Sequence, residues 1–305
     1  LSYEIDLWGR IRRQNEAAGA EALASRFARD SVRLALIGQV ANEYLTLRSH
    51  DAEVAVSQET VTSRENTLRI VRARLEAGSA SALELAQAEN SLATAQSQLS
   101  QLKRLRALSE NQIGLLAGQP GLQIPVNLTP LPLPPVPPPG LPSTLLEARP
   151  DVRQAEETLI AANARIGVAK AAYFPAISLT GAYGSESAAL SNLFTAPATI
   201  WSAVLGLSMP IFNAGLTGAR VDQASAGQKE MLANYRKTMQ TAFKEVNDAL
   251  VSLRELADEE TANIAQLDSA RRSLKLSQAR YEAGYVGFLE VLDAQRTTIE
   301  QQGCR

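Results

Sequence analysis

The sequence predicts an α+β membrane protein in which long antiparallel helical hairpins join short β-strands, built as two structural repeats. The first observation is a near-duplicate segment: residues 74–86 read RLEAGSASALELA, and residues 280–292 read RYEAGYVGFLEVL, with no gap and an offset of 206 residues. The second is that each copy lies between long proline-free stretches of helix-forming sequence. The third is that short segments of alternating apolar and polar residues precede both long stretches. Self-similarity at a fixed offset indicates a repeat architecture.

Composition excludes several function classes. The 305 residues carry 30 basic and 32 acidic side chains, and this even balance gives no basic face for nucleic acid. Cys304 and His50 are the only residues of their kinds, so neither a disulfide framework nor His-based catalysis is expected. The sequence contains no nucleophile motif, phosphate loop or metal-ligand cluster, and we expect no enzyme activity and no cofactor. The sequence has no run of 18 apolar residues, so it predicts no transmembrane helix.

Residues 1–118 are assigned to the first repeat. Residues 1–8 alternate with period two and predict a strand. From about Gly9 to Ala77 apolar residues recur at helical spacing without a proline, which predicts a helix of about 65 residues and about 100 Å. Gly78 is a good helix C-cap, so it marks a hairpin tip, and the return helix runs from Ser81 to about Ala117.

Residues 119–150 form a connector that holds 11 of the 14 prolines. Proline-rich sequence favours extended backbone. Two interpretations stay open: a flexible disordered linker, or a strap packed across the helices.

Residues 151–305 are assigned to the second repeat. A helix to about Tyr173 is followed by two alternating strands, 176–184 and 201–211. A second long helix runs from Gly215 to Ala283, turns at a tip at Gly284, and starts back to about residue 302. By symmetry between the repeats we expect a fragment that lacks both termini, because the second repeat has about 60 residues before its strand at Trp201 and the first has none.

The two strands have the length and alternation of strands that cross a bilayer, although soluble sheets can show the same pattern. Their apolar face is predicted to meet lipid. Strands in lipid must close into a barrel, and three or four cannot close alone, so oligomerisation is required. The residues predicted to face lipid are Ile177, Leu179, Tyr183, Trp201, Leu205 and Leu207.

Four stretches carry a family resemblance. They are YEIDLWGR at 3–10, LLEARPDVR at 145–153, AANARIGVAKAAYFPAISL at 161–179, and the two glycine tips. With them the chain resembles the TolC-type outer-membrane efflux channels, most closely their NodT-like lipoprotein branch. The resemblance covers essentially the whole chain. In that branch the lipid-bearing cysteine would lie near a true N-terminus that we expect to be absent here.

The resemblance implies a homotrimer in the bacterial outer membrane whose protomers each give four strands to one 12-stranded barrel. The helices would continue it as a periplasmic tunnel. The implied function is the passive exit duct of a tripartite pump for drugs, other small molecules or metal ions, working with a periplasmic adaptor protein and an inner-membrane pump. The alternatives are a type I protein-secretion channel with the same fold and a soluble coiled-coil scaffold.

The resemblance also implies site residues. Glu290 and Asp293 lie three apart on one helix face and would ring the narrowest tunnel opening as a periplasmic gate; the alternative is a solvated helix surface. Glu84 would be bonded to Tyr281 as a latch between the hairpins, the alternative being a tyrosine packed in the helix seam. The family's basic residue two positions after the second tip glycine is replaced here by Val286. The tips that would dock the adaptor are Gly78, Ser79, Gly284 and Tyr285.

Overall fold

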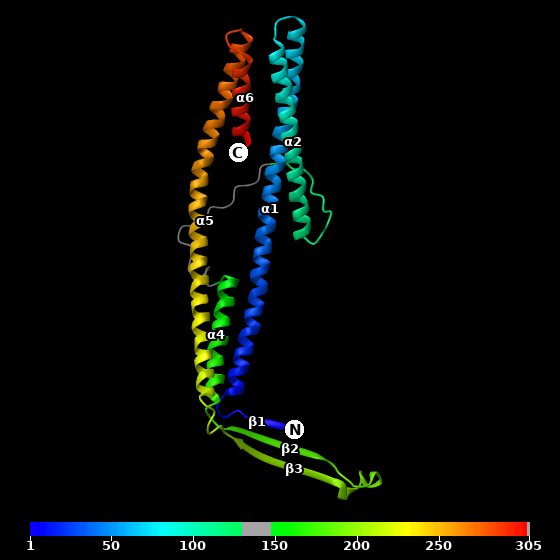
Figure 1. Ribbon diagram of the computed structural model, residues 1–305, viewed down its shortest axis with the longest axis vertical. Coiled ribbons are helices and arrows are strands. Elements are labelled where there is room, and N and C mark those ends of the chain that lie inside the picture. The colour runs from blue at the N-terminus through cyan, green and yellow to red at the C-terminus, as the bar shows by residue number, and fades with distance from the viewer. Residues whose placement is uncertain (130–147, 304–305) are drawn as a thin grey trace. The chain divides into compact units, whose positions relative to one another are not determined.

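The computed structural model describes residues 1–129 and 148–303, and its elements are labelled in Figure 1. Residues 130–147, with most of the connector's prolines, and Cys304 lie outside the described residues. Two short 3₁₀ turns, Leu190–Asn192 and Ala196–Ala198, separate the last two strands. The main elements in chain order are β1 Ser2–Ile5, α1 Arg10–Glu76, α2 Ala82–Leu116, α4 Pro150–Ala171, β2 Ala176–Ser185, β3 Thr199–Ser208, α5 Leu216–Glu282 and α6 Phe288–Gly303.

The two long helices correspond residue for residue. Both α1 and α5 contain 67 residues, and their first residues, Arg10 and Leu216, are 206 positions apart. Each begins directly after a glycine with a left-handed backbone, Gly9 at φ 79° and Gly215 at φ 84°. The offset seen at the tips therefore holds without a gap from the start of each long helix to its end.

The chain divides into two compact units that cut across these repeats. The first unit comprises Leu1–Arg33 and Pro137–Val246, and the second comprises Leu34–Val136 and Asn247–Arg305. Both long helices contribute one part to each unit, so neither unit is a repeat. The first unit holds the sheet, and the second holds the hairpin tips.

The sheet of the first unit has the order β1-β2-β3, with both neighbouring pairs antiparallel. We expected the last strand to span 201–211, but β3 spans Thr199–Ser208. It ends early because Ser208 pairs with Ala176, the first residue of β2, and Pro175 before it has no N–H to extend the ladder.

Small residues let α4 pack closely in the first unit. Ala161 and Ala164 on α4 are each 1% exposed. A Cβ added to Gly167 would lie 2.9 Å from Cγ of Arg13, so the α4 backbone directly meets the start of α1. Arg149, before the first turn of α4, pairs with Glu245 on α5 at 2.7 Å. Helix α4 and the residue before it thus contact both long helices within the first unit.

Two hydrophobic clusters fill the second unit. The larger joins both hairpin ends, with Val71 of α1 and Ala88 of α2 packed against Phe288 and Val291 of α6. The smaller consists of Val61 of α1 and Ala95 and Leu99 of α2. In Figure 1, α2 runs back beside α1, and α6 runs back beside α5. The helical hairpins are therefore held by small groups of apolar side chains on narrow stripes of each helix.

Residues 119–129, the described start of the connector, lie as a strap against the first hairpin. The buried Asp51 carboxylate on α1 accepts from Nε of Arg106 at 2.8 Å and from the backbone N–H of Asn127 at 3.3 Å. Arg106 donates through Nη2 to the carbonyl of Ile124 at 2.7 Å, and Glu110 accepts the N–H of Ile124 at 2.6 Å. The Asp51 carboxylate chiefly, and Glu110 beside it, raise the pKa of Arg106, and together they outweigh its partial burial, which lowers the pKa.

Replacing Asp51 by alanine should lower the free energy of unfolding by about 3 kcal/mol, because it removes the buried partner of Arg106 and the acceptor of the Asn127 N–H, and leaves Arg106 only its longer pair with Glu110 at 3.3 Å. Urea unfolding followed by helical circular dichroism measures the loss. Glu89→Ala is the matched control, since its pair with Arg72 is 49% and 56% exposed and is expected to contribute about 0.5 kcal/mol or less. Equal losses for both variants would contradict a buried clamp.

Candidate functional site: the strand face and the hairpin ends

All six residues predicted to face lipid lie on one face of the sheet. Directly opposed residues of antiparallel strands point to the same side. The register pairs Ile177 with Leu207, Leu179 with Leu205, and Tyr183 with Trp201. Tyr183 is 84% exposed and Trp201 is 77% exposed. The face is thus a continuous apolar surface that nothing in the described chain covers.

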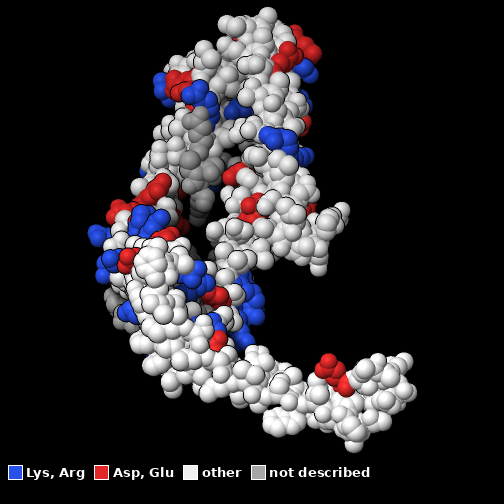
Figure 2. All heavy atoms as spheres, turned by 60° about the horizontal axis from the view of Figure 1, so that its bottom comes forward, with Lys and Arg blue, Asp and Glu red and all other residues white. Residues whose placement is uncertain are grey.

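Charge is almost absent from this part of the chain. Between Lys170 and Arg220 the sequence contains one charged residue, Glu186, which follows β2 directly. Figure 2 shows an uncharged stretch that ends in acidic atoms, as the sequence of β2, β3 and Glu186 requires. The opposite face carries Ser178, Thr180 and Ser202, interrupted by apolar side chains. Among the described residues, no helix combines the length and the apolar character needed to cross a membrane.

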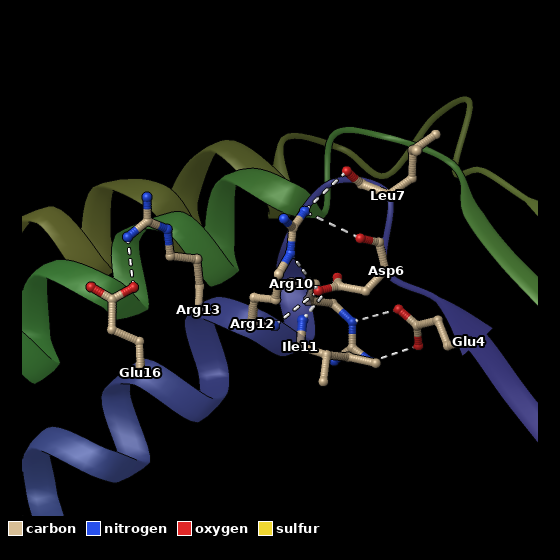
Figure 3. A network of polar contacts seen from close by, with 8 residues as sticks. All are labelled: Glu4, Asp6, Leu7, Arg10, Ile11, Arg12, Arg13 and Glu16. Atoms are coloured by element: carbon tan, nitrogen blue, oxygen red, sulfur yellow. Dashed lines mark hydrogen bonds and ion pairs between the residues drawn. The ribbon is translucent and has the colours of Figure 1, made fainter.

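A polar network fixes the turn from β1 into α1 (Figure 3). The Asp6 carboxylate accepts the N–H groups of Ile11 at 3.0 Å and Arg12 at 2.9 Å, which caps the positive end of the helix. Partial burial raises the pKa of Asp6, but these N–H groups and the Arg12 guanidinium outweigh it and hold the pKa below its usual range. Glu4 and Arg10 form a two-bond pair at 2.6 and 2.9 Å.

The same turn is clamped to the turn before β2. The Trp8 ring stacks on Phe174, with centroids 4.6 Å apart and an angle of 18° between the planes. Trp8 Nε1 also donates to the carbonyl of Pro175 at 2.8 Å. Two of the sequence stretches that carry the resemblance therefore meet where strands become helices.

Both hairpin tips have the same backbone motif. Gly78 and Gly284 adopt φ 71° and 79°. The N–H of Ser79 bonds to the carbonyl of Arg74 at 2.8 Å, and the N–H of Tyr285 bonds to the carbonyl of Arg280 at 2.9 Å. With the glycine N–H groups bonded three residues back, each tip is a Schellman C-cap. Tyr285 is 81% exposed, so the tips present a free surface in this chain.

The start of the return helix differs between the two tips. Ser81 caps α2 and shares a reciprocal capping box with Glu84. The equivalent of Ser81 in the second repeat is Gly287, which has no side chain to cap with. Glu290 is therefore released from capping, and its carboxylate pairs with Arg280 of α5 at 2.8 Å. Both members of this pair are about half exposed.

Glu290 and Asp293 share an exposed face of α6, as their spacing predicts. Sequence reasoning missed Arg280 as their neighbour. A signal was present, because an arginine begins the duplicated segment in both copies, at 74 and 280. One carboxylate of the expected pair is therefore neutralised within its own chain.

Tyr281 lies half-buried in the seam between the hairpins. Its ring contacts Phe288 at a centroid distance of 5.5 Å, and the Arg74 guanidinium lies 5.1 Å from its centroid. Within the described ranges Tyr281 and Glu84 share no hydrogen bond, since Glu84 is engaged with Ser81. Of the two interpretations of Tyr281, the contacts are those of a packed seam residue.

Comparison with known proteins defines the class. A family profile described as outer membrane efflux protein matches residues 1–119 and 141–302. The chain belongs to this family. That membership confirms the resemblance found in the sequence and the outer-membrane localisation expected from it.

Two curated relatives and one solved structure show how far the similarity extends. The chain is 39% identical over 306 aligned positions to the solvent efflux pump outer membrane protein SrpC of Pseudomonas putida, covering 99% of this chain and 64% of that protein. It is 36% identical to the cation efflux system protein CusC of Escherichia coli, covering 97% and 65%. A crystal structure of a membrane protein from Pseudomonas aeruginosa matches with 37% identity and a TM-score of 0.95, covering all of this chain and 71% of that one. The fold class predicted from the sequence is confirmed, and the chain spans about 64% of the length of the curated relatives it matches.

Alanine substitutions at Gly78, just beyond the end of α1, and at Gly38, inside α1, should change stability in opposite directions. Gly78→Ala should cost about 1–2 kcal/mol, because a Cβ is unfavourable at φ 71° even with nothing within 4 Å of it. Gly38→Ala, in the exposed interior of α1 with equally open space, should stabilise the helix by about 1 kcal/mol. Thermal melting of both variants measures the difference, and a stabilised Gly78→Ala would contradict the tip geometry.

Proposed function

We propose that this protein is the outer-membrane exit duct of a tripartite efflux pump, working as a homotrimer with a 12-stranded barrel. The observation that carries the proposal is the uncharged, outward-facing apolar surface of a sheet whose outer strands, β1 and β3, have no further partner in the described chain. Lipid suits the apolar face, and closure by other copies satisfies the strand edges. In a soluble scaffold, the apolar face and the strand edges would both stay exposed to water.

Export through this duct needs no chemistry from the chain. The energy comes from an inner-membrane pump, and the helical part in the periplasm is docked by an adaptor protein at Gly78, Ser79, Gly284 and Tyr285. The relatives favour efflux over protein secretion. Their named cargoes differ, solvents for SrpC and cations for CusC, at similar identity to this chain. Cargo selection is therefore assigned to the pump and adaptor.

Two neighbouring residues on opposite faces of β3 test the membrane assignment. Leu205→Arg places a charge on the proposed lipid face and should cost about 2–4 kcal/mol near the membrane midplane. Val204→Arg places the same charge on the proposed water-filled side and should assemble like the wild type. The variants are made in the full-length protein. Mass measurement in mild detergent should give a trimer for the wild type and Val204→Arg, and a reduced trimer fraction for Leu205→Arg. A monomeric wild type, or equal effects of the two arginines, would refute the proposal.

The periplasmic gate is proposed at Glu290 and Asp293, which threefold symmetry would gather around the narrowest opening. Like charges crowded around an axis attract cations. Arg280 offsets Glu290 within each chain at 2.8 Å. For Asp293, the described residues offer no such ion pair. Asp293 therefore supplies most of the ring's unpaired charge.

The proposed gate predicts an order of cation preference, and of block by divalent ions, for three variants of the channel in planar bilayers. Asp293→Asn should weaken cation preference and block by divalent ions more than Glu290→Gln does. Arg280→Gln should strengthen both, because it leaves Glu290 without its counter-charge. The differences should be largest at 0.01 M salt, where the Debye length is about 30 Å. If all three conduct like the wild type, the two carboxylates are an ordinary solvated helix face.

A further inference from the structure

The second unit contains a polar cavity that the export function leaves unexplained. It has a volume of about 250 Å³, is partly open to solvent, and is lined by residues of α1, α5 and α6 of the same chain. A water molecule occupies about 30 Å³ of liquid, so the space exceeds a single trapped water. The lining residues that matter for its chemistry are Glu59, Thr60, Arg64, Gln278, Gln295 and Thr298.

Two buried polar atoms lining this cavity, one on Arg64 and one on Gln295, have no hydrogen-bond partner among the described residues. Arg64 is 7% exposed, and its Nη1 has no hydrogen bond. Gln295 is also 7% exposed, and its Oε1 has none. Burial lowers the pKa of Arg64, the direction expected when a cation loses water and gains no counter-charge. Such groups in a native structure are rare and expensive.

The neighbouring side chains do not meet this need. The Thr60 hydroxyl donates to the carbonyl of Val56, and the Thr298 hydroxyl donates to the carbonyls of Ala270 and Ala294. Among the lining residues that the structure describes, Glu59 is the one carboxylate, and it is exposed. Within the described ranges it forms no ion pair with Arg64. The cavity thus holds a buried positive charge with room beside it.

We propose that this cavity binds a small oxyanion, a carboxylate or phosphate group, between Arg64 and Gln295. A guanidinium recognises both groups through paired N–H bonds. The Gln295 amide can turn by 180°, which exchanges its oxygen for its NH₂ and presents a second donor to the same anion. An anion would satisfy both orphaned side chains and neutralise the charge.

Arg64 has no counterpart at the equivalent position of the second repeat. The position 206 residues after Arg64 is Ala270, which is buried and whose carbonyl accepts the Thr298 hydroxyl. The arginine is therefore not required by the hairpin architecture that the repeats share. Its presence marks a feature specific to the first repeat.

The test compares thermal melting of the purified protein in sodium phosphate and in sodium chloride of equal ionic strength. Phosphate stabilises proteins generally, so the informative quantity is the difference between variants. The wild type should gain about 2 °C more from phosphate than Arg64→Met does. Arg64→Met should also melt higher than the wild type in chloride, because it removes an uncompensated buried charge. Sodium acetate in a parallel series shows whether a carboxylate serves as well as a phosphate.

Arg69→Met is the matched control, since it removes an exposed arginine from the same helix and should keep the wild-type phosphate response. Glu59→Gln should also keep the wild-type phosphate response. If Glu59→Gln loses that response, Glu59 is the partner of Arg64 and the proposal is overturned. Equal phosphate responses of the wild type and Arg64→Met would also overturn it. Should Arg64→Met fail to fold, equilibrium dialysis of the wild type with labelled phosphate decides: one saturable site per chain supports the proposal, and none refutes it. This readout is binding alone, so it is independent of the proposed export function.

Discussion

The unpaired edges of the three-stranded sheet are the constraint on which the rest of the structure depends. A sheet with an apolar, uncharged face belongs in lipid, and lipid offers no hydrogen bonds to a free strand edge. The strands therefore require partners beyond those the described chain provides. In the proposed trimer, the other elements hold β1, β2 and β3 in a fixed register and direction, so that copies of the chain can complete one another.

The delivery is achieved by polar and small-residue contacts rather than by a large core. Asp6 caps α1 directly after β1, and Trp8 stacks on Phe174 before β2, so the turn from β1 into α1 is held against the turn from α4 into β2. Alanines such as Ala161 and Ala164 let α4 approach its neighbours closely. Many large apolar side chains on the long helices stay exposed, including Leu34 at 56% and Val251 at 61%. A helix wall with such a surface is suited to neighbours on both sides.

Much of this was predictable from the sequence because it depends on periodicity. Local sequence pattern predicts the 206-residue offset, the glycine tips and the long helices. It also predicts that Tyr183 and Trp201 lie on the apolar face of their strands. The end of β3 was not predictable in this way, because it depends on Pro175, which directly precedes the neighbouring strand β2. The pairing of Glu290 with Arg280 depends on the absence of a cap at Gly287, a difference between two otherwise similar segments. The isolation of Arg64 depends on which side chains its distant neighbours present, and no local pattern records that.

The equal length of α1 and α5 has a consequence for how such a chain can change. Removing one residue from a helix shortens it by about 1.5 Å and turns everything beyond the deletion by about 100°. A deletion confined to α1 would misalign its tip with that of α5 and rotate its apolar stripe out of the seam. Length changes are tolerable only when both helices change together, by a whole number of heptads or of eleven-residue units, which restore the facing. The length of each of the two helices therefore limits the length that the other can have.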